Sequence, residues 1–175
     1  MIPSDHLEHL ADLLADERAP ASRRITRMLI ERYLERTKDP SFLMDRLRNE
    51  SPGVMADLLR AVSHVMPEAA MIEAVGLAGH PASEVQLEVI WVLGRSDDVG
   101  LVDKVLTGML KSSFEEVRIR VLEHVELYGG EGSFQMLIEY AQHRSTRRMS
   151  HRECEATGTI MAAISPSASM KVFSD

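Results

Sequence analysis

Hydrophobic residues between Glu84 and Leu110 fall into two stretches with helical spacing, separated by a short polar segment at 94–98. The apolar positions are Val85, Val89, Trp91 or Val92, and Leu93 in the first stretch, and Val99, Val102, Val105, Leu106 and Leu110 in the second. Because residues three and four positions apart share one face of a helix, this pattern predicts two amphipathic helices joined by a turn. One such hairpin cannot bury both of its apolar stripes, so we expect similar hairpins on either side.

The same pattern recurs before and after this hairpin. A forward shift of about 32 residues pairs Val85, Val89, Ile90 and Leu93 with Val117, Val121, Leu122 and Val125, and a backward shift of about 31 pairs them with Val54, Leu58, Leu59 and Val62. The predicted turns at 64–67, 95–98 and 128–131 occupy matching places. Periods of this size are typical of helical solenoids, which favours an all-α fold of stacked hairpins.

Two stretches carry a resemblance to a known family: Glu84-Val-Gln-Leu-Glu-Val-Ile-Trp-Val-Leu-Gly and Phe114-Glu-Glu-Val-Arg-Ile-Arg-Val-Leu-Glu-His-Val. Their acidic start, Val-Arg-like pair and apolar helix closing in Leu-Gly resemble HEAT repeats, of the armadillo and HEAT class. The copy that begins at Phe114 differs from this pattern, because its glycines, Gly129 and Gly130, come a few residues later than the pattern places them. The resemblance extends from about Ala21 to the C-terminus. It implies an all-α, right-handed α-solenoid of about five stacked helical hairpins.

We therefore predict a single domain over 1–175, with an N-terminal capping helix at 4–17 and repeats at 21–50, 51–80, 82–111, 113–143 and 149–175. Ser4 is the expected N-cap of the capping helix, whose Leu7, Leu10, Leu13 and Leu14 have helical spacing. His6 and His9 stand three apart, a spacing that metal ligands use, but no cysteine or second pair completes a set, so we expect a solvated pair.

The first repeat is divergent. Shifted by about 29 residues, its Ile25, Leu29, Ile30 and Tyr33 fall on the apolar positions of the second repeat, so Ile25, Met28 or Leu29, and Tyr33 are the expected buried stripe. Pro40 falls at a predicted first helical position, where its missing N–H costs nothing. The segment 21–50 has eight basic and five acidic residues, which gives either a solvated basic face or a contact for an acidic partner.

Composition agrees with a helical domain and narrows its setting. The chain has 175 residues, of which 45% are hydrophobic and only 5% aromatic, enough for one largely aliphatic core. Its single cysteine excludes an internal disulfide framework and suits a reducing compartment. The sequence has no run of roughly 18 apolar residues and no leader pattern, so we expect a cytoplasmic protein.

Charge argues against nucleic acid along the whole surface. The net charge is −7, and 51–142 contains six basic and fourteen acidic residues, a field that repels phosphates. The acids near helix starts are explained by capping. The string at 143–152 is the main exception: Arg144, Arg147, Arg148 and Arg152 either contact an anion or acidic partner or form a basic exposed loop. In this string Ser150 follows a pattern that basophilic kinases use.

Catalytic chemistry finds little support in the sequence. His151 and Glu153 distantly resemble the His-Glu pairs of HEAT-like iron hydroxylases, but those pairs are adjacent and repeated, whereas Arg152 interrupts this one. Cys154 follows His151 by three residues without a further triad partner, so we expect a small half-buried thiol. Trp91 matches core positions of neighbouring repeats. We predict no catalytic residue, metal or cofactor.

The favoured function is a scaffold or adaptor that binds a partner protein on the solenoid surface. Polar residues on the second helices form the expected contact surface: Glu73, Asp103, Lys104, Thr107, Lys111, Gln135, Glu139 and Gln142. Apolar Phe173 near the C-terminus suggests either self-association through that edge or a chain cut from a longer array. The alternatives are a HEAT-like enzyme, similar to a lyase or a DNA glycosylase, and a nucleic-acid-binding module that uses the basic ends.

Overall fold

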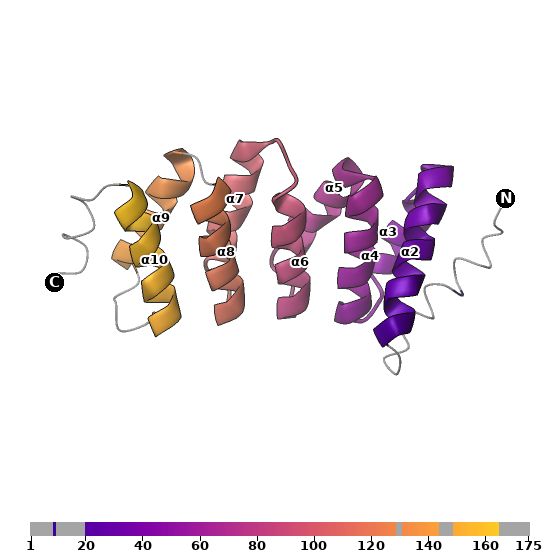
Figure 1. Cartoon of the computed structure of the whole chain (residues 1–175), viewed down its shortest axis with the longest axis horizontal. Helices are drawn as coiled ribbons and strands as arrows, with labels where there is room; N and C mark the ends of the chain where they lie inside the picture. Colours follow the sequence, from indigo (N-terminus) through magenta and orange to yellow (C-terminus); the bar gives the residue numbers. More distant parts are fainter. Residues whose placement is uncertain (1–8, 10–19, 129–130, 144–148, 165–175) are drawn as a thin grey trace. The chain divides into compact units, whose positions relative to one another are not determined.

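The computed structural model describes residues 9, 20–128, 131–143 and 149–164, and all regular secondary structure within them is α-helical (Figure 1). The helices are α2 (Pro20–Thr37), α3 (Ser41–Leu47), α4 (Pro52–Val65), α5 (Pro67–Leu77), α6 (Ser83–Leu93), α7 (Val99–Met109), α8 (Glu115–Tyr128), α9 (Glu131–His143) and α10 (His151–Ile164). The predicted all-α class is confirmed for this part of the chain. The capping helix predicted at 4–17, apart from an exposed His9, and the segment after residue 164 lie outside the described residues.

The chain divides into two compact units, 1–96 and 97–175. In the first unit α4 is central and packs against α2, α3, α5 and α6. In the second unit α8 packs against α7 and α10, and α9 packs against the same two helices. The division falls between α6 and α7, inside the hairpin predicted at 82–111, and each unit therefore has its own packed core.

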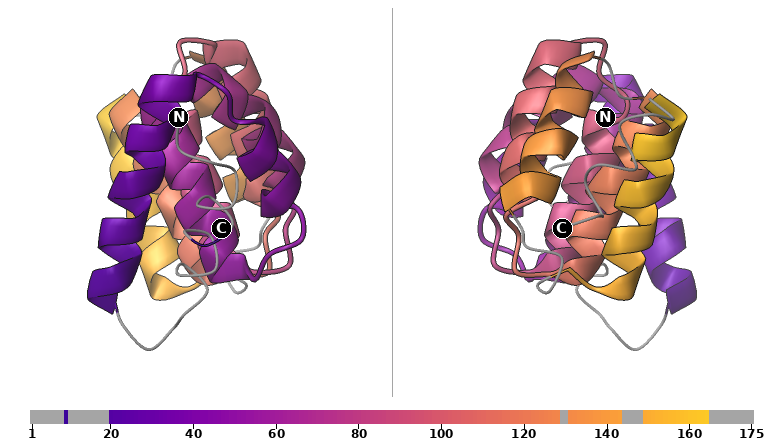
Figure 2. Two further views of the ribbon diagram at one scale, coloured as in Figure 1. Left: turned by 90° about the vertical axis from the view of Figure 1, so that its right-hand side faces the viewer. Right: turned by 90° about the vertical axis from the view of Figure 1, so that its left-hand side faces the viewer.

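A tight turn at 38–40 joins the first two described helices, which run in opposite directions (Figure 2). Lys38 ends α2 with φ 55°, the left-handed conformation that commonly terminates helices, and its N–H donates to the Leu34 carbonyl at 2.9 Å. Pro40 lies one residue before α3 rather than at its first position, as the N-cap residue. Its carbonyl accepts from the Met44 N–H at 2.9 Å, so it still opens the hydrogen bonding of the helix.

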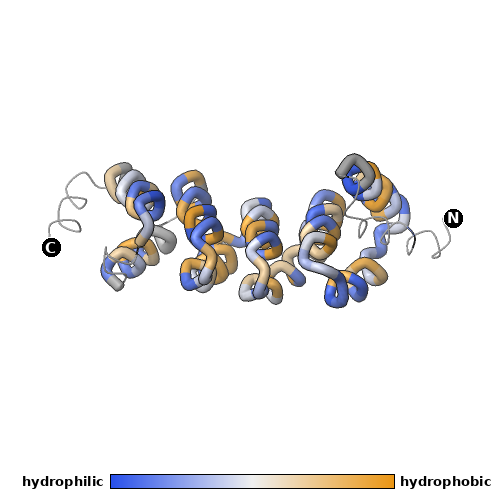
Figure 3. The backbone as a smooth tube through the Cα atoms, turned by 90° about the horizontal axis from the view of Figure 1, so that it is seen from below, coloured by the Kyte–Doolittle hydropathy of each residue, from blue (hydrophilic) through white to orange (hydrophobic). Residues whose placement is uncertain are grey.

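The buried positions of α4, α6 and α8 recur with the predicted period. The matched sets, none more than 2% exposed, are Val54, Val85 and Val117; Leu58, Val89 and Val121; Leu59, Ile90 and Leu122; and Val62, Leu93 and Val125. Figure 3 shows apolar and hydrophilic positions interleaved along these helices, as expected for amphipathic helices. The aliphatic stripe read from the sequence is therefore the packed stripe in all three.

The register predicted for α2 is wrong by one residue. Ile25 is 59% exposed and Leu29 is 47% exposed, whereas Thr26, Ile30 and Leu34 are almost completely buried against the rest of the unit. A shift of 28 rather than 29 residues aligns these buried positions with those of α4. Because neighbouring residues on a helix point about 100° apart, the one-residue error turned the predicted stripe outward.

Two further apolar residues expected in the core lie at the surface. Trp91 is 37% exposed and Val99 is 52% exposed. On α6 the buried neighbours of Trp91 are Ile90 and Val92, which leaves the position between them facing outward. The first turn of α7 likewise exposes Val99, while Val102 and Leu106 are buried.

The turns before α6 and α8 repeat one hydrogen-bonding pattern. The Ala82 N–H donates to Nδ1 of His80 at 3.1 Å, and the Phe114 N–H donates to Oγ of Ser112 at 3.2 Å. In each turn the backbone carbonyl of the same residue also accepts a hydrogen bond from a long polar side chain six residues later. Gln86 Nε2 donates to the His80 carbonyl, and Arg118 Nη1 donates to the Ser112 carbonyl. Residues 32 positions apart thus perform the same local task.

Candidate functional site

An exposed cluster around Trp91 is the most distinctive polar surface of the first unit. The rings of His64 and Trp91 are stacked, with centroids 5.2 Å apart and an interplanar angle of 18°. Two guanidinium groups lie over the indole, with Arg95 at 5.0 Å and Arg60 at 5.7 Å from the ring centroid. We call Arg60, His64, Trp91 and Arg95 the Trp91 cluster.

Helical spacing explains why these four side chains meet. Arg60 and His64 are four residues apart on α4, and Trp91 and Arg95 are four apart at the end of α6. Residues with that spacing lie on the same side of a helix. The Arg95 N–H donates to the Val92 carbonyl at 3.1 Å, which continues the turn just beyond the last residue of α6. Since α4 and α6 pack together, the two pairs face each other.

Arg60 is fixed by a carboxylate beneath it. Its Nε donates to Oε1 of Glu88 at 2.9 Å, and its Nη2 forms a second short bond to Oε2 of the same residue. Glu88 is only 3% exposed, and this hydrogen bonding raises the pKa of Arg60. The bidentate pair holds the guanidinium in place next to the indole.

Arg95 and the indole N–H have unused hydrogen-bonding capacity. Within the residues that the structure describes, the Arg95 guanidinium has no carboxylate or hydrogen-bond partner beyond its contact with the ring, and the Trp91 N–H has no acceptor. Guanidinium and indole groups are donors only. This part of the cluster therefore suits a ligand that supplies acceptor oxygens.

Most of the partner surface predicted in the second unit is exposed. Lys104, Thr107 and Lys111 are exposed on or just after α7, and the exposed residues of α9 are Gln135, Glu139 and Gln142. The two helices pack against each other, so both groups belong to one pair of helices. Asp103, the remaining member on α7, is half-buried, and its carbonyl accepts from the Thr107 hydroxyl at 2.7 Å.

The other predicted contact residues belong to other parts of the sequence than α7 and α9. Glu73 belongs to the first unit, where its carboxylate pairs with Arg48 at 2.6 Å. Arg152 is exposed on the first turn of α10. The remaining basic residues of the string, Arg144, Arg147 and Arg148, lie outside the described residues.

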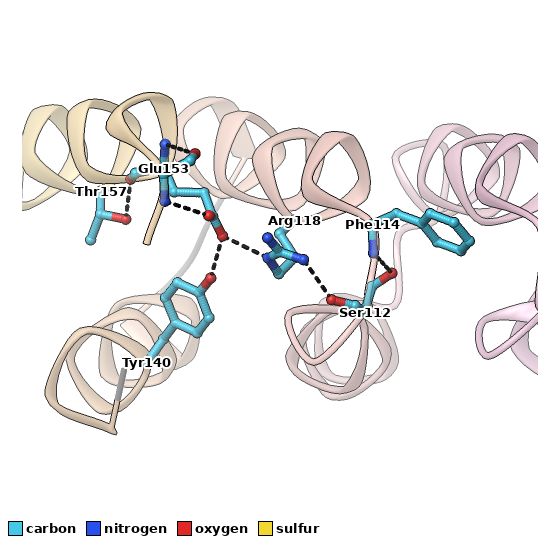
Figure 4. A network of polar contacts seen from close by, with 7 residues as sticks. Ser112, Phe114, Arg118, Tyr140, Glu153 and Thr157 are labelled. Carbon is cyan, nitrogen blue, oxygen red and sulfur yellow. Dashed lines mark hydrogen bonds and ion pairs between the residues drawn. The ribbon is translucent and has the colours of Figure 1, made fainter. Parts of the chain in front are cut away.

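A buried polar network centred on Glu153 joins three helices of the second unit (Figure 4). Oε1 of Glu153 accepts from Arg118 Nε at 2.6 Å and from the Tyr140 hydroxyl at 2.9 Å. Its Oε2 accepts from the Ser150 N–H at 2.9 Å, and the Ser150 hydroxyl accepts from the Glu153 N–H at 3.2 Å. The last two bonds form a capping box at the start of α10. Ser150, considered above as a kinase site, thus has a structural role at the helix terminus.

The Glu153 carboxyl is ionised well below ordinary pH. Its burial raises the pKa, but the hydrogen bonds from Arg118, the Ser150 N–H and Tyr140 outweigh burial and lower the pKa from 4.5 to about 2. The same pairing raises the pKa of Arg118. Glu153 and Arg118 are 1% and 8% exposed, so the network is a buried ion pair that links α8 to α10.

The residues considered for metal or thiol chemistry do not converge. The His151 ring lies 4.0 Å from the carboxylate of Glu155, on the exposed side of α10, whereas Glu153 points into the protein toward Arg118. Cys154 is half-buried, as predicted. Among the described residues no three His, Cys, Asp or Glu side chains are grouped so that they could hold a metal ion. None of the described helices combines the length and apolarity needed to cross a membrane.

Sequence reasoning missed the Trp91 cluster and the partner of Glu153. A signal for the first was available, because Trp91 lies between two residues of the aliphatic stripe and must point away from at least one of them. For the second, the signal was a charged residue on α10 at a place where α8 has an aliphatic one. Aligned on the helix starts, Glu153 corresponds to Val117. Comparisons with protein families, with curated proteins and with solved structures find no match to this chain.

Proposed function

We propose that this chain is a HEAT-like helical-repeat scaffold that binds a partner protein. The observation that carries the repeat assignment is the shared turn before α6 and α8, in which His80 and Ser112 accept the same two hydrogen bonds. The recurring burial of α4, α6 and α8 supports it independently. Such repeats bury a continuous core by stacking and leave an extended surface for a partner.

The contact surface that we propose is the α7–α9 face of the second unit. It is defined by the exposed residues Lys104, Thr107, Lys111, Gln135, Glu139 and Gln142. These side chains take no part in the core. By contrast, α8 and α10 use Arg118 and Glu153 for a buried ion pair with each other. Long, mixed-charge polar side chains on paired helices suit recognition of another protein surface. A single cysteine leads us to propose the cytoplasm as its setting.

Charge reversal on the α7–α9 face tests the proposal. The intact chain and a Lys104→Glu/Lys111→Glu variant would be used to capture partners from source lysate, with chemical cross-linking to locate the contact. Arg24→Glu, at an exposed position of α2, is the matched control. We expect one stoichiometric partner to be retained by the control and lost from the double variant, with unchanged circular dichroism.

Equal recovery by the intact chain and the double variant would show that this face is not the contact surface. Absence of any cross-linked stoichiometric partner would contradict the scaffold function itself. The repeat assignment has a separate test in an experimental structure, which would contradict it if consecutive hairpins did not lie side by side.

A further inference from the structure

We propose that the Trp91 cluster is a second contact site, which binds an acidic segment of a partner protein through carboxylate groups. The inference rests on the proposed partner-binding function but concerns a different surface, on α4 and α6 of the first unit. Trp and Arg are the residue types most enriched among those that dominate binding energy at protein interfaces. Here one Trp and two Arg residues are grouped at a surface where the Trp is 37% exposed.

The available hydrogen-bonding groups select an anionic ligand. The indole N–H and the guanidinium of Arg95 are donors, and neither has an acceptor among the described residues. A carboxylate offers acceptor oxygens only, and it accepts from guanidinium groups in a favourable two-bond geometry. The ligand that matches these donors is therefore a side-chain or terminal carboxylate next to an apolar contact for the indole.

The cluster is also held in place before a ligand arrives. Stacking with His64 restricts the indole, and the bidentate bonds to buried Glu88 restrict Arg60. Side chains that are already ordered lose less conformational freedom on binding. Glu88 neutralises Arg60 internally, so Arg95 is left as the guanidinium that a ligand can pair with.

The charge pattern favours an acidic protein segment over nucleic acid. Nucleic acid binding draws its affinity from contacts between many phosphates and several Lys or Arg side chains. One unpaired arginine beside one tryptophan matches a short run of carboxylates with an apolar residue. A phosphate backbone would instead need a continuous basic track.

Trp91 is the single tryptophan of the chain, so tryptophan fluorescence reports the surroundings of this one indole. The probe is a synthetic peptide rich in Glu and Asp with a central Leu, and the reference is the same peptide with Gln and Asn in place of the acids. We expect a saturable change in Trp91 fluorescence with the acidic peptide and none with the reference. The affinity should fall as salt concentration rises, because the contact is exposed.

Variants separate this site from general charge attraction. Arg95→Gln should weaken binding by about tenfold, since it removes one charged contact. Arg24→Gln is the matched control, because Arg24 is also exposed and also has no ion pair among the described residues. It should bind as the unmodified chain does. Trp91→Phe, measured by anisotropy of a labelled peptide, should also bind more weakly, and thermal melts would confirm that each variant is folded.

Four results would overturn the inference: no saturable change, equal binding of the Gln and Asn peptide, equal weakening by Arg24→Gln, or tighter binding of a single-stranded oligonucleotide than of the acidic peptide. Failure here is distinguishable from failure of the scaffold proposal. If the peptide does not bind but the captured partner is still lost from the Lys104→Glu/Lys111→Glu variant, only the Trp91 site is wrong.

Discussion

Glu153 is a buried carboxylate on α10, at the position that corresponds to aliphatic Val117 when α10 and α8 are aligned on their starts. In place of apolar packing, the second unit supplies it with hydrogen bonds from Arg118, Tyr140 and the Ser150 N–H. A buried ion pair contributes little net stability compared with a well-packed apolar pair, but loss of one partner leaves the other charge uncompensated. The network therefore makes the position of α10 against α8 depend on one specific pair.

Substitution of either partner should be costly, and substitution of both should cost less than the sum. We expect Glu153→Met or Arg118→Met to lower the free energy of unfolding by about 3–5 kcal/mol each, because a buried charge is left unpaired. In the double variant the effects should be coupled by about 1–3 kcal/mol. Urea denaturation measures all three.

The control for this cycle is the exposed pair of Arg120 and Glu123, whose atoms are 3.4 Å apart on the surface of α8. Substitution of Arg120 should change the free energy of unfolding by less than about 1 kcal/mol. Simple additivity for Arg118 and Glu153 would show that the two residues do not act as a pair.

The lowered pKa of Glu153 predicts a stability loss in acid. Its pKa is about 2 in the folded chain, compared with 4.5 as its ordinary value. The contribution is therefore complete above about pH 5 and is lost as the pH falls toward 2, with a total on the order of 3 kcal/mol. We expect the stability difference between the unmodified chain and Glu153→Gln, measured by urea denaturation, to shrink over this range. A constant difference would contradict the assigned pKa.

At the scale of elements, α2 shows how a helix can be predicted correctly while its buried side is not. Its sequence offers two overlapping apolar stripes, one with Ile25 and Leu29 and one with Ile30 and Leu34. Packing against α4 selects the second stripe and turns the first, with Met28, to the surface. Local periodicity establishes that the segment is amphipathic, but the neighbouring helix decides which stripe is covered.

Paired substitutions on α2 distinguish the two registers. Leu34→Ala should lower the free energy of unfolding by about 2–5 kcal/mol, since it deletes a fully buried side chain. Ile25→Gln and Leu29→Gln should each change it by less than about 0.5 kcal/mol, because both residues are exposed and Gln is a good helix former. Thermal or urea unfolding measures each variant. If Ile25→Gln and Leu29→Gln lowered the free energy of unfolding more than Leu34→Ala does, the register expected from the sequence would be the correct one.

At the scale of the whole molecule, packing is concentrated in two units that meet between α6 and α7 in the sequence. The period of about 31–32 residues continues through this point, since α6 and α8 share buried positions and the same turn. Sequence repetition and the density of contacts therefore divide the chain differently.

Core substitutions in the two units should have local consequences. Leu58→Ala in α4 should increase hydrogen exchange in the first unit by about tenfold or more, with a smaller effect on residues 97–175. Leu122→Ala in α8 should show the opposite distribution. Exchange measured by mass spectrometry resolves the two parts. A uniform increase along the chain would show that the molecule opens as one cooperative body.

The sequence by itself determined the helical class, the period and most of the buried aliphatic positions of α4, α6 and α8. These features depend on local spacing, and a stripe of Val and Leu at three- and four-residue intervals specifies both a helix and the side that packs. Three of the predicted contact residues on α9 and three on or just after α7 are exposed, since their place on the polar side is equally local, and their contact with a partner stays a prediction.

Tertiary structure alone decided the features that depend on contacts between distant residues. It selected the covered stripe of α2, placed Trp91 beside two residues of α4, and brought Arg118 to a carboxylate 35 positions later in the chain. Successive side chains on a helix point about 100° apart, so a small change in how the helix is turned about its axis exchanges a buried residue for an exposed one. Packing against the neighbouring helix decides that orientation. Spacing defines the faces of each helix, whereas packing defines what each face meets.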